Sequence, residues 1–94
     1  MSANRKKIVI TVVGKDSVGI IAKVCTYLAN NAVNILDISQ TIVDGFFNMM
    51  MIVDVADCSK EFGTIVDELE QIGEEMACII KAQREEIFNE MHRI

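Results

Sequence analysis

The residues with the clearest chemical potential lie in a short loop, Gly14 to Gly19, that follows a run of β-branched residues. Lys15 carries a cation that attracts a carboxylate or phosphate, and Asp16 carries an anion that attracts an ammonium group. The backbone N–H groups at the start of the following helix also attract anions. Asp16 or Ser17 has a second interpretation, as the cap of this helix, and the two roles are compatible. The loop therefore indicates a small polar binding site.

Other chemistries lack the residues that they need. Catalysis by Ser or Cys requires a base within hydrogen-bond reach, but the single histidine, His92, lies near the C-terminus. No second His accompanies it, which argues against a metal site. The three cysteines form no C-x-x-C pair, which favours small apolar roles in a reducing, cytoplasmic location. We therefore expect no catalytic residue, no metal and no cofactor.

Composition argues against two classes of partner and favours a third. The net charge is −5, whereas binding to nucleic acid or an anionic membrane needs a positive field. No apolar run approaches the roughly 20 residues of a membrane span, and we expect no signal peptide. Hydrophobic residues make up 51% of the 94 residues, more than so small a core can hide. We therefore expect a further buried surface, most simply a homodimer interface.

The first half of the chain contains the elements that must position the loop. The β-branched run 7–13 predicts a buried strand that ends at Gly14. An apolar stripe at helical spacing then predicts a helix that ends at Asn30-Asn31, because Asn tolerates the left-handed conformation of a C-terminal cap. The stripe consists of Val18, Ile21, Val24, Cys25 and Leu28. Residues 33–43 alternate in polarity and predict a second strand, with Leu36, Ile38 and Ile42 on one face.

The second half predicts two more strands and two more helices. Asp44-Gly45 is a hairpin signal, so residues 46–55 should form a third strand antiparallel to the second. Both faces of that strand are mainly apolar, so its second face should also be covered. A helix is expected from Ser59 to about Gly73, and a fourth strand over residues 76–83. Residues 84–94 predict a short final helix that packs in its own chain or on a partner.

The order of these elements predicts an α+β, ferredoxin-like βαββαβ fold, a four-stranded antiparallel sheet with two helices on one face. With no linker in the sequence, we expect one domain over residues 1–94, with a core of about 6–83. The fold alone does not define a function. An acylphosphatase-like enzyme requires an arginine in the first loop, which this loop lacks. An RNA-recognition domain requires stacking aromatics on both central strands, and the first strand has none.

The stretch from Gly14 to Ile42 resembles the opening half of an ACT domain, a small regulatory module attached to many proteins of amino-acid metabolism. The resemblance rests on two motifs, G-x-D-x-x-G-I and N-I-x-D. They comprise Gly14, Asp16, Gly19 and Ile20, then Asn34, Ile35 and Asp37. The rest of the chain matches in the order of its elements. Short stand-alone ACT proteins and the ACT halves of the glycine-cleavage transcriptional regulator are the most similar in layout.

This resemblance implies a non-catalytic module that binds an amino acid at a homodimer interface. Dimers of the family pair their sheets side by side, and the loop Gly14 to Gly19 of one chain then faces the start of the second strand. With the loop residues, the candidate ligand-binding set is Gly14, Lys15, Asp16, Ser17, Gly19, Ile20, Asn34, Ile35 and Asp37.

Three questions stay open at the level of sequence. No enzyme or DNA-binding domain accompanies the module, so we expect it to act on a separate partner protein. An adaptor that binds a partner without a small-molecule ligand is the alternative function. The apolar surfaces are compatible with a dimer or a tetramer.

Overall fold

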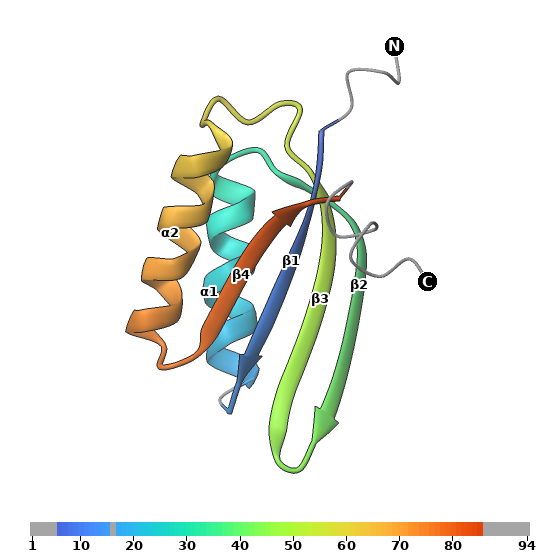
Figure 1. Cartoon of the computed structure of the whole chain (residues 1–94), viewed down its shortest axis with the longest axis vertical. Helices are drawn as coiled ribbons and strands as arrows, with labels where there is room; N and C mark the ends of the chain where they lie inside the picture. The colour runs from blue at the N-terminus through green and yellow to red at the C-terminus, as the bar shows by residue number, and fades with distance from the viewer. Residues whose placement is uncertain (1–5, 16, 86–94) are drawn as a thin grey trace.

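The computed structural model describes residues 6–15 and 17–85, with Ser17 described by its backbone alone (Figure 1). The elements are β1 (Lys7–Gly14), α1 (Ser17–Asn30), β2 (Asn34–Val43), β3 (Phe46–Asp54), α2 (Phe62–Glu75) and β4 (Ile79–Arg84). The strands form one sheet in the order β2-β3-β1-β4, and each neighbouring pair is antiparallel. Figure 1 shows both helices on one side of this sheet. The predicted ferredoxin-like fold is confirmed.

The hydrophobic core lies between the sheet and the two helices. Alternate residues of β1 and β3 face the helices, because a strand turns every second side chain to the same side. The fully buried side chains from these strands and from both helices include Ile10, Val12, Met51, Val53, Ile20, Val24, Leu28, Ile65 and Leu69. Among the described residues, no buried polar side chain interrupts this core. Burial of apolar surface is therefore its main source of stability.

The stripe predicted for α1 is wrong at its first position. Val18 is 78% exposed, whereas Ile20 is fully buried. Ile20, Val24 and Leu28 follow an i, i+4, i+8 pattern toward the sheet, and Ile21 is only partly buried. Adjacent apolar residues at 20 and 21 fit two helical registers equally well, so periodicity alone did not separate them.

The two helix ends also differ from their predictions in mechanism. After α1, the left-handed residue is Ala32 (φ 57°) and neither asparagine, while the Asn31 side chain donates a hydrogen bond to the Tyr27 carbonyl. α2 continues to Glu75, two residues beyond Gly73. A Cβ at Gly73 would lie 2.8 Å from the Cys78 carbonyl oxygen, so this glycine allows close packing inside the helix. The asparagines and Gly73 thus lie near the helix ends, as predicted, but they act there by other mechanisms than those expected.

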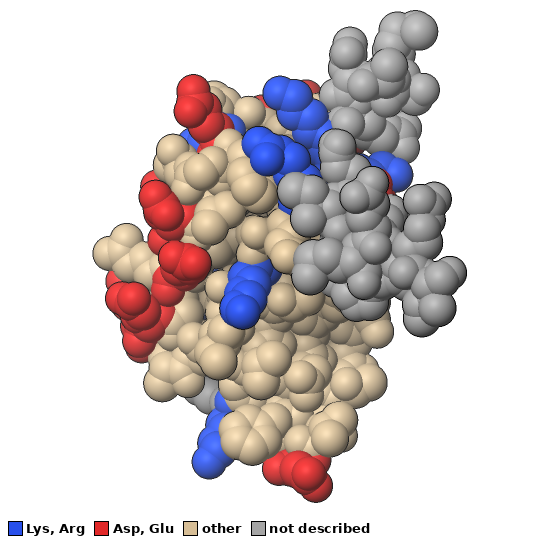
Figure 2. Space-filling view, viewed as in Figure 1, with Lys and Arg blue, Asp and Glu red and all other residues tan. Residues whose placement is uncertain are grey.

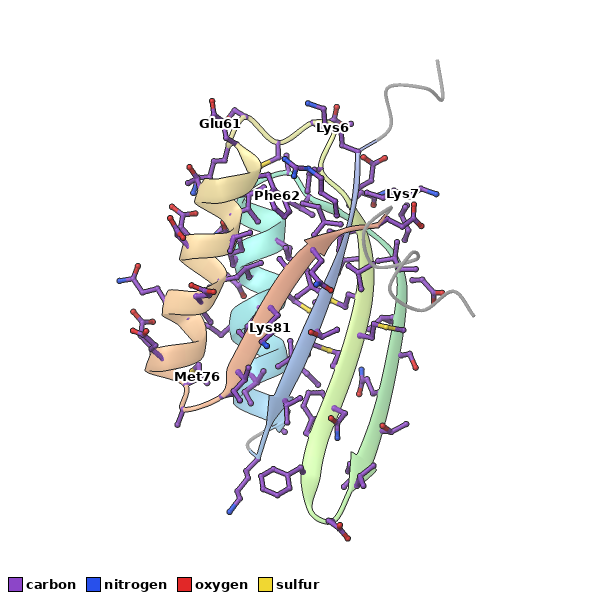
Figure 3. The ribbon with its side chains drawn as sticks, viewed as in Figure 1. Lys6, Lys7, Glu61, Phe62, Met76 and Lys81 are labelled. Carbon is purple, nitrogen blue, oxygen red and sulfur yellow. The ribbon has the colours of Figure 1, made fainter. Side chains whose placement is uncertain are left out.

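The connection after α2 shortens the fourth strand. Met76 follows the helix (Figure 3). Ala77 adopts a left-handed φ of 55°, and the Cys78 N–H donates a hydrogen bond to the Gly73 carbonyl. β4 therefore begins at Ile79, three residues later than predicted, and ends at Arg84. The remainder of the predicted final helix, 86–94, lies outside the described residues.

The hairpin between β2 and β3 is confirmed. Asp44 and Gly45 both have positive φ, 53° and 80°, as a type I′ turn requires. β2 lies at the edge of the sheet beyond the helices, and each of its 10 residues is exposed (Figure 1). The strand thus offers an unpaired backbone edge.

The surface charges are unevenly distributed. Figure 2 shows acidic side chains gathered along α2 and most Lys and Arg side chains at the end of the molecule where β1 begins. In the part of the chain that the structure describes, no helix has the length and apolar character needed to cross a membrane.

Candidate functional site

The predicted loop lies at the end of the sheet where β1 finishes. Gly14 is the last residue of β1, and Gly19 and Ile20 lie in the first turn of α1. A Cβ at Gly14 would lie 2.6 Å from Ile20 Cδ1 and 2.7 Å from Cys78 Cβ. Gly14 is therefore needed for space, because it lets α1 and the connection before β4 approach the end of β1.

Lys15 reaches from this loop toward the hairpin between β2 and β3. Its Nζ lies 5.4 Å from the ring centroid of Phe46, a cation–π contact at the surface. A hollow of about 320 Å³ lies beside it, lined in part by Lys15, Phe46, Glu74 and Ile79. Asp16 and the side chain of Ser17 are outside the described residues. The loop, the hairpin and the start of β4 thus meet around a shallow surface depression.

The second group of predicted residues lies at the opposite end of the sheet. Asn34 pairs with Asp54, and Asp54 pairs with Lys7 at the start of β1. Gly14 instead pairs with Phe47, which pairs with Ile42 near the end of β2. Within one chain, therefore, the loop at Gly14 and the motif at Asn34 are separated by the length of the strands. A site that uses both groups requires two chains.

A β-bulge shapes the start of β2. The register shifts between Ile35 and Asp37, so Ile35 pairs with the buried Val53 and Asp37 pairs with Ile52. Ile35 thus shares the helix-side face with Ile38 and Ile42, the place that strict alternation assigned to Leu36. Asp37 Oδ1 accepts a hydrogen bond from the Ile38 N–H at 2.9 Å. The bulge places Asn34 and Asp37 on the face opposite to the helices.

One polar cluster was not singled out from the sequence. The Tyr27 hydroxyl donates a 2.6 Å hydrogen bond to Glu68 Oε1, and Lys60 Nζ lies 2.6 Å from the same oxygen. The hydrogen bonds from Lys60 and then Tyr27 lower the pKa of Glu68. Burial, followed by the bond to Glu68, raises the pKa of Tyr27. The cluster joins α1 to α2 across 41 residues of sequence, so no local pattern indicates it.

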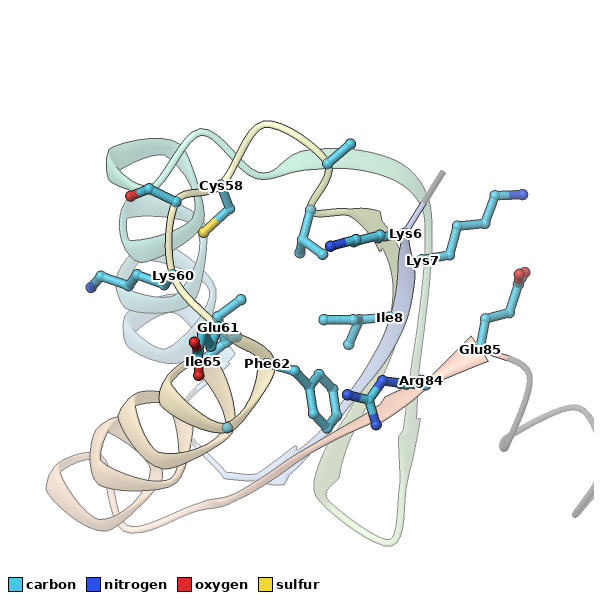
Figure 4. Close-up of a pocket in the computed structure, with 14 residues that line it drawn as sticks. Lys6, Lys7, Ile8, Cys58, Lys60, Glu61, Phe62, Ile65, Arg84 and Glu85 are labelled. Atoms are coloured by element: carbon cyan, nitrogen blue, oxygen red, sulfur yellow. The ribbon is translucent and has the colours of Figure 1, made fainter. Parts of the chain in front are cut away.

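A cavity of about 920 Å³ lies at the end of the sheet where β1 begins, and we call it the β1-start cavity. It lies between the start of β1, the β3–α2 connection, the first turn of α2 and the end of β4 (Figure 4). None of the seven predicted ligand-binding residues whose side chains the structure describes lines it. Its residues come from three separate stretches of the sequence, 6–8, 55–65 and 84–85, so sequence spacing did not bring them together.

The described residues contain no group of three or more His, Cys, Asp and Glu side chains that could hold a metal ion. All three cysteines are free thiols and partly buried. Burial raises the pKa of Cys78, which reduces the fraction of the reactive thiolate at neutral pH.

Comparison with known proteins agrees with this architecture. Residues 6–83 match the ACT domain family. A UPF0237 protein of Bifidobacterium longum is 62% identical over 88 residues, which cover 94% of this chain and 98% of that protein. An ACT domain protein from Streptococcus pneumoniae has a TM-score of 0.78 at 41% identity, with 88% of this chain and 93% of that chain covered.

A larger protein shares the same fold. The structure described as a putative glycine cleavage system transcriptional repressor has a TM-score of 0.70 at 26% identity. The match covers 85% of this chain and 45% of that one, so it involves only part of the other protein. The family match over most of the chain and the relative of similar length lead to one conclusion: the chain belongs to the ACT domain family.

Proposed function

We propose that this protein is a non-catalytic regulatory module that binds an amino acid at the interface of a homodimer. The observation that carries the proposal is the position of the two predicted groups, at opposite ends of a sheet whose edge strand β2 is exposed. An antiparallel pair of β2 strands from two chains puts the start of one strand beside the end of the other. The loop of one chain then comes near the Asn34 motif of the second chain.

The exposed edge supports this mode of assembly. β2 presents unpaired backbone groups along 10 residues, and pairing them removes an edge that is otherwise prone to aggregation. Ile35, Ile38 and Ile42 lie along its helix-side face with exposures of 37%, 40% and 73%. Burial of apolar surface contributes about 2.5 kcal/mol for each 100 Å². Contact between these side chains of two paired strands therefore stabilises a small domain substantially.

The charges around the proposed site suit an amino acid. Lys15 and the N–H groups at the start of α1 attract a carboxylate. Asp16 of one chain, or Asp37 of the other, attracts an ammonium group. Asp37 uses one oxygen for the Ile38 N–H, and its second oxygen has no partner among the described residues. The likeness to a protein named for regulating glycine cleavage supports an amino acid as the ligand class.

A regulatory module of this kind must act on another protein. We place the protein in the cytoplasm as a single domain over residues 1–94, where the ligand-bound dimer acts on a separate partner protein. An adaptor without a small-molecule ligand is the second candidate, and the apolar edge of β2 equally suits contact with another protein.

Thermal unfolding in the presence of each common amino acid tests the proposal. A ligand at about 100 times its Kd adds about 2.7 kcal/mol to stability and should raise Tm by about 10 °C or more. Asp16→Ala should remove this increase without loss of fold. Asp57→Ala, which removes an exposed carboxylate in the β3–α2 connection, is the matched control and should keep it. If no amino acid raises the Tm of the unmodified protein, the result contradicts the ligand proposal and favours the adaptor.

A further inference from the structure

We propose that the β1-start cavity binds the oxyanion group of a small organic molecule. The cavity has a volume of about 920 Å³, at the upper end of the roughly 300–1,000 Å³ typical of small-molecule sites. Among the described residues, it shares none with the proposed amino-acid site, and it lies at the other end of β1 from the Gly14 loop. The inference therefore does not depend on the function proposed above.

Positive charge is concentrated around this cavity in a protein whose net charge is −5. Four of the seven Lys and Arg side chains in the described residues line it: Lys6, Lys7, Lys60 and Arg84. Two carboxylates, Glu61 and Glu85, also line it. Figure 4 shows the ends of Lys6 and Arg84 directed into the cavity, whereas Lys7 and Glu85 point away from it. The groups that face an entering ligand from β1 and β4 are thus cationic.

Lys6 and Arg84 differ from Lys60 in their availability. Lys60 Nζ is bound to Glu68 at 2.6 Å and lies 5.5 Å from the ring centroid of Tyr27. Neither Lys6 nor Arg84 forms an ion pair with any carboxylate of residues 6–15 and 17–85. Two cations that line a cavity and have no ion-pair partner in the described part of the chain attract an anion from solution.

The guanidinium of Arg84 is already oriented. It stacks on the Phe62 ring, with Cζ 4.3 Å from the ring centroid. Stacking uses the flat face of the guanidinium and leaves N–H donors at its edges, and this fork matches a carboxylate or a phosphate. Less side-chain freedom is therefore lost when an oxyanion binds.

The start of α2 adds a smaller contribution. Its N-cap residue, Glu61, has an extended backbone and makes no side-chain capping hydrogen bond. The N–H groups of the first helical turn therefore add positive partial charge at the cavity. The proposal rests on the two cations that face the cavity, and the helix end supplements them.

Apolar side chains define the rest of the ligand. Val55 and Phe62 are the partly exposed apolar side chains that line the cavity, whereas Ile8 and Ile65, which also line it, are at most 2% exposed. A bare inorganic ion makes no use of this apolar surface, whereas an organic body buries against it. The ligand class is therefore a small organic molecule that carries a phosphate or a carboxylate.

Titration of the full chain, followed through its backbone amide NMR signals, tests this site with three probes. Phenyl phosphate and benzoate carry the two oxyanions on the same ring, and benzyl alcohol is the neutral control. At least one anion should shift the amides of Ile8, Phe62 and Gly63 saturably, and benzyl alcohol should not. The tighter of the two anions identifies the oxyanion. The proposal is overturned if neither anion shifts these amides, if the alcohol shifts them equally, or if the shifts are confined to residues 14–20.

Three variants test which side chains carry the binding. Arg84→Gln and Lys6→Gln should each weaken the bound anion by about tenfold, since each removes a charge-assisted hydrogen bond. Lys6→Gln keeps the contact between Arg84 and Phe62, so it separates lost binding from lost packing. Lys81→Gln, at an exposed position of β4 (Figure 3), should leave the affinity unchanged. An equal loss in all three variants indicates nonspecific charge attraction and overturns the proposal.

Discussion

At the scale of single residues, two glycines of this chain differ in the free space that a Cβ atom would have. Gly14 has side-chain atoms of Ile20 and Cys78 within 2.7 Å of the position that a Cβ would take. Gly63, in the first turn of α2, has nothing within 4 Å of the corresponding position. The same substitution should therefore have opposite effects at these two sites.

Gly14→Ala should destabilise the fold by about 1–3 kcal/mol, because the new methyl group overlaps Ile20 and Cys78 and forces α1 or the connection before β4 to shift. Gly63→Ala, the control, should leave stability unchanged or raise it by up to about 1 kcal/mol, because alanine favours helix. Urea denaturation at one fixed protein concentration measures both variants. Equal effects of the two substitutions would show that the close contacts at Gly14 relax without cost.

Glu68 gives a second prediction at this scale, on pH dependence. The hydrogen bonds from Lys60 and Tyr27 lower its pKa in the folded state. Folding therefore gains stability from this carboxylate above its unfolded pKa of about 4, and this gain is lost as pH falls through the lower folded value. At neutral pH, the Tm of Glu68→Gln should thus be lower than that of the unmodified protein. As pH falls, the Tm of the variant should decrease less than that of the unmodified protein.

The comparison uses Tm measured from pH 7 down to about pH 3, across the ordinary carboxylate pKa. Glu70→Gln removes a carboxylate from the exposed side of the same helix and serves as the control. A Glu68→Gln curve parallel to that of the unmodified protein would contradict a role of this cluster in acid stability.

At the scale of elements, an isoleucine-to-lysine substitution should have different consequences on the two edge strands of the sheet, β2 and β4. In a symmetric antiparallel pair of β2 strands, the middle of the strand lies near its own copy. Ile38→Lys should therefore bring two like charges together and convert the proposed dimer to a monomer, since charged edge residues block strand pairing. Ile38 is 40% exposed, so the fold of the single chain should tolerate the lysine.

Ile79→Lys is the matched control, because Ile79 is an exposed isoleucine on β4, the other edge strand. It should leave the dimer intact. Light scattering during size-exclusion chromatography measures the molar mass of both variants. A monomer produced by Ile79→Lys and not by Ile38→Lys would assign the interface to β4 and contradict the proposed site.

At the scale of the whole molecule, the Gly14 loop and the β1-start cavity lie at opposite ends of the sheet. The Gly14 loop lies where β1 ends, and the β1-start cavity lies where β1 begins (Figures 1 and 4). The proposed amino-acid site needs a second chain, whereas the cavity is formed within one chain. Loss of the dimer should therefore remove the first kind of binding and preserve the second.

The order of the elements, the hairpin and the family could all be predicted from the sequence. Alternation in β1, helical spacing in α2 and the Asp44-Gly45 turn are local properties, because each depends on residues a few positions apart. The two motifs that carried the resemblance, around Gly14 and Asn34, are also short. The same signals located α1 and yet did not distinguish Ile20 from Ile21 as its buried position.

The tertiary structure decided which residues meet. The register of the sheet set the Gly14 loop and the Asn34 motif at opposite ends, and the bulge gave Ile35 the face expected of Leu36. The contact between Tyr27 and Glu68 and the grouping of Lys6 with Arg84 join segments far apart in the chain. Such contacts depend on how strands pair and helices pack, and local periodicity carries no information about them. The helices, the strands and the hairpin turn could therefore be predicted from local sequence, whereas the residues that come together in a site depend on packing.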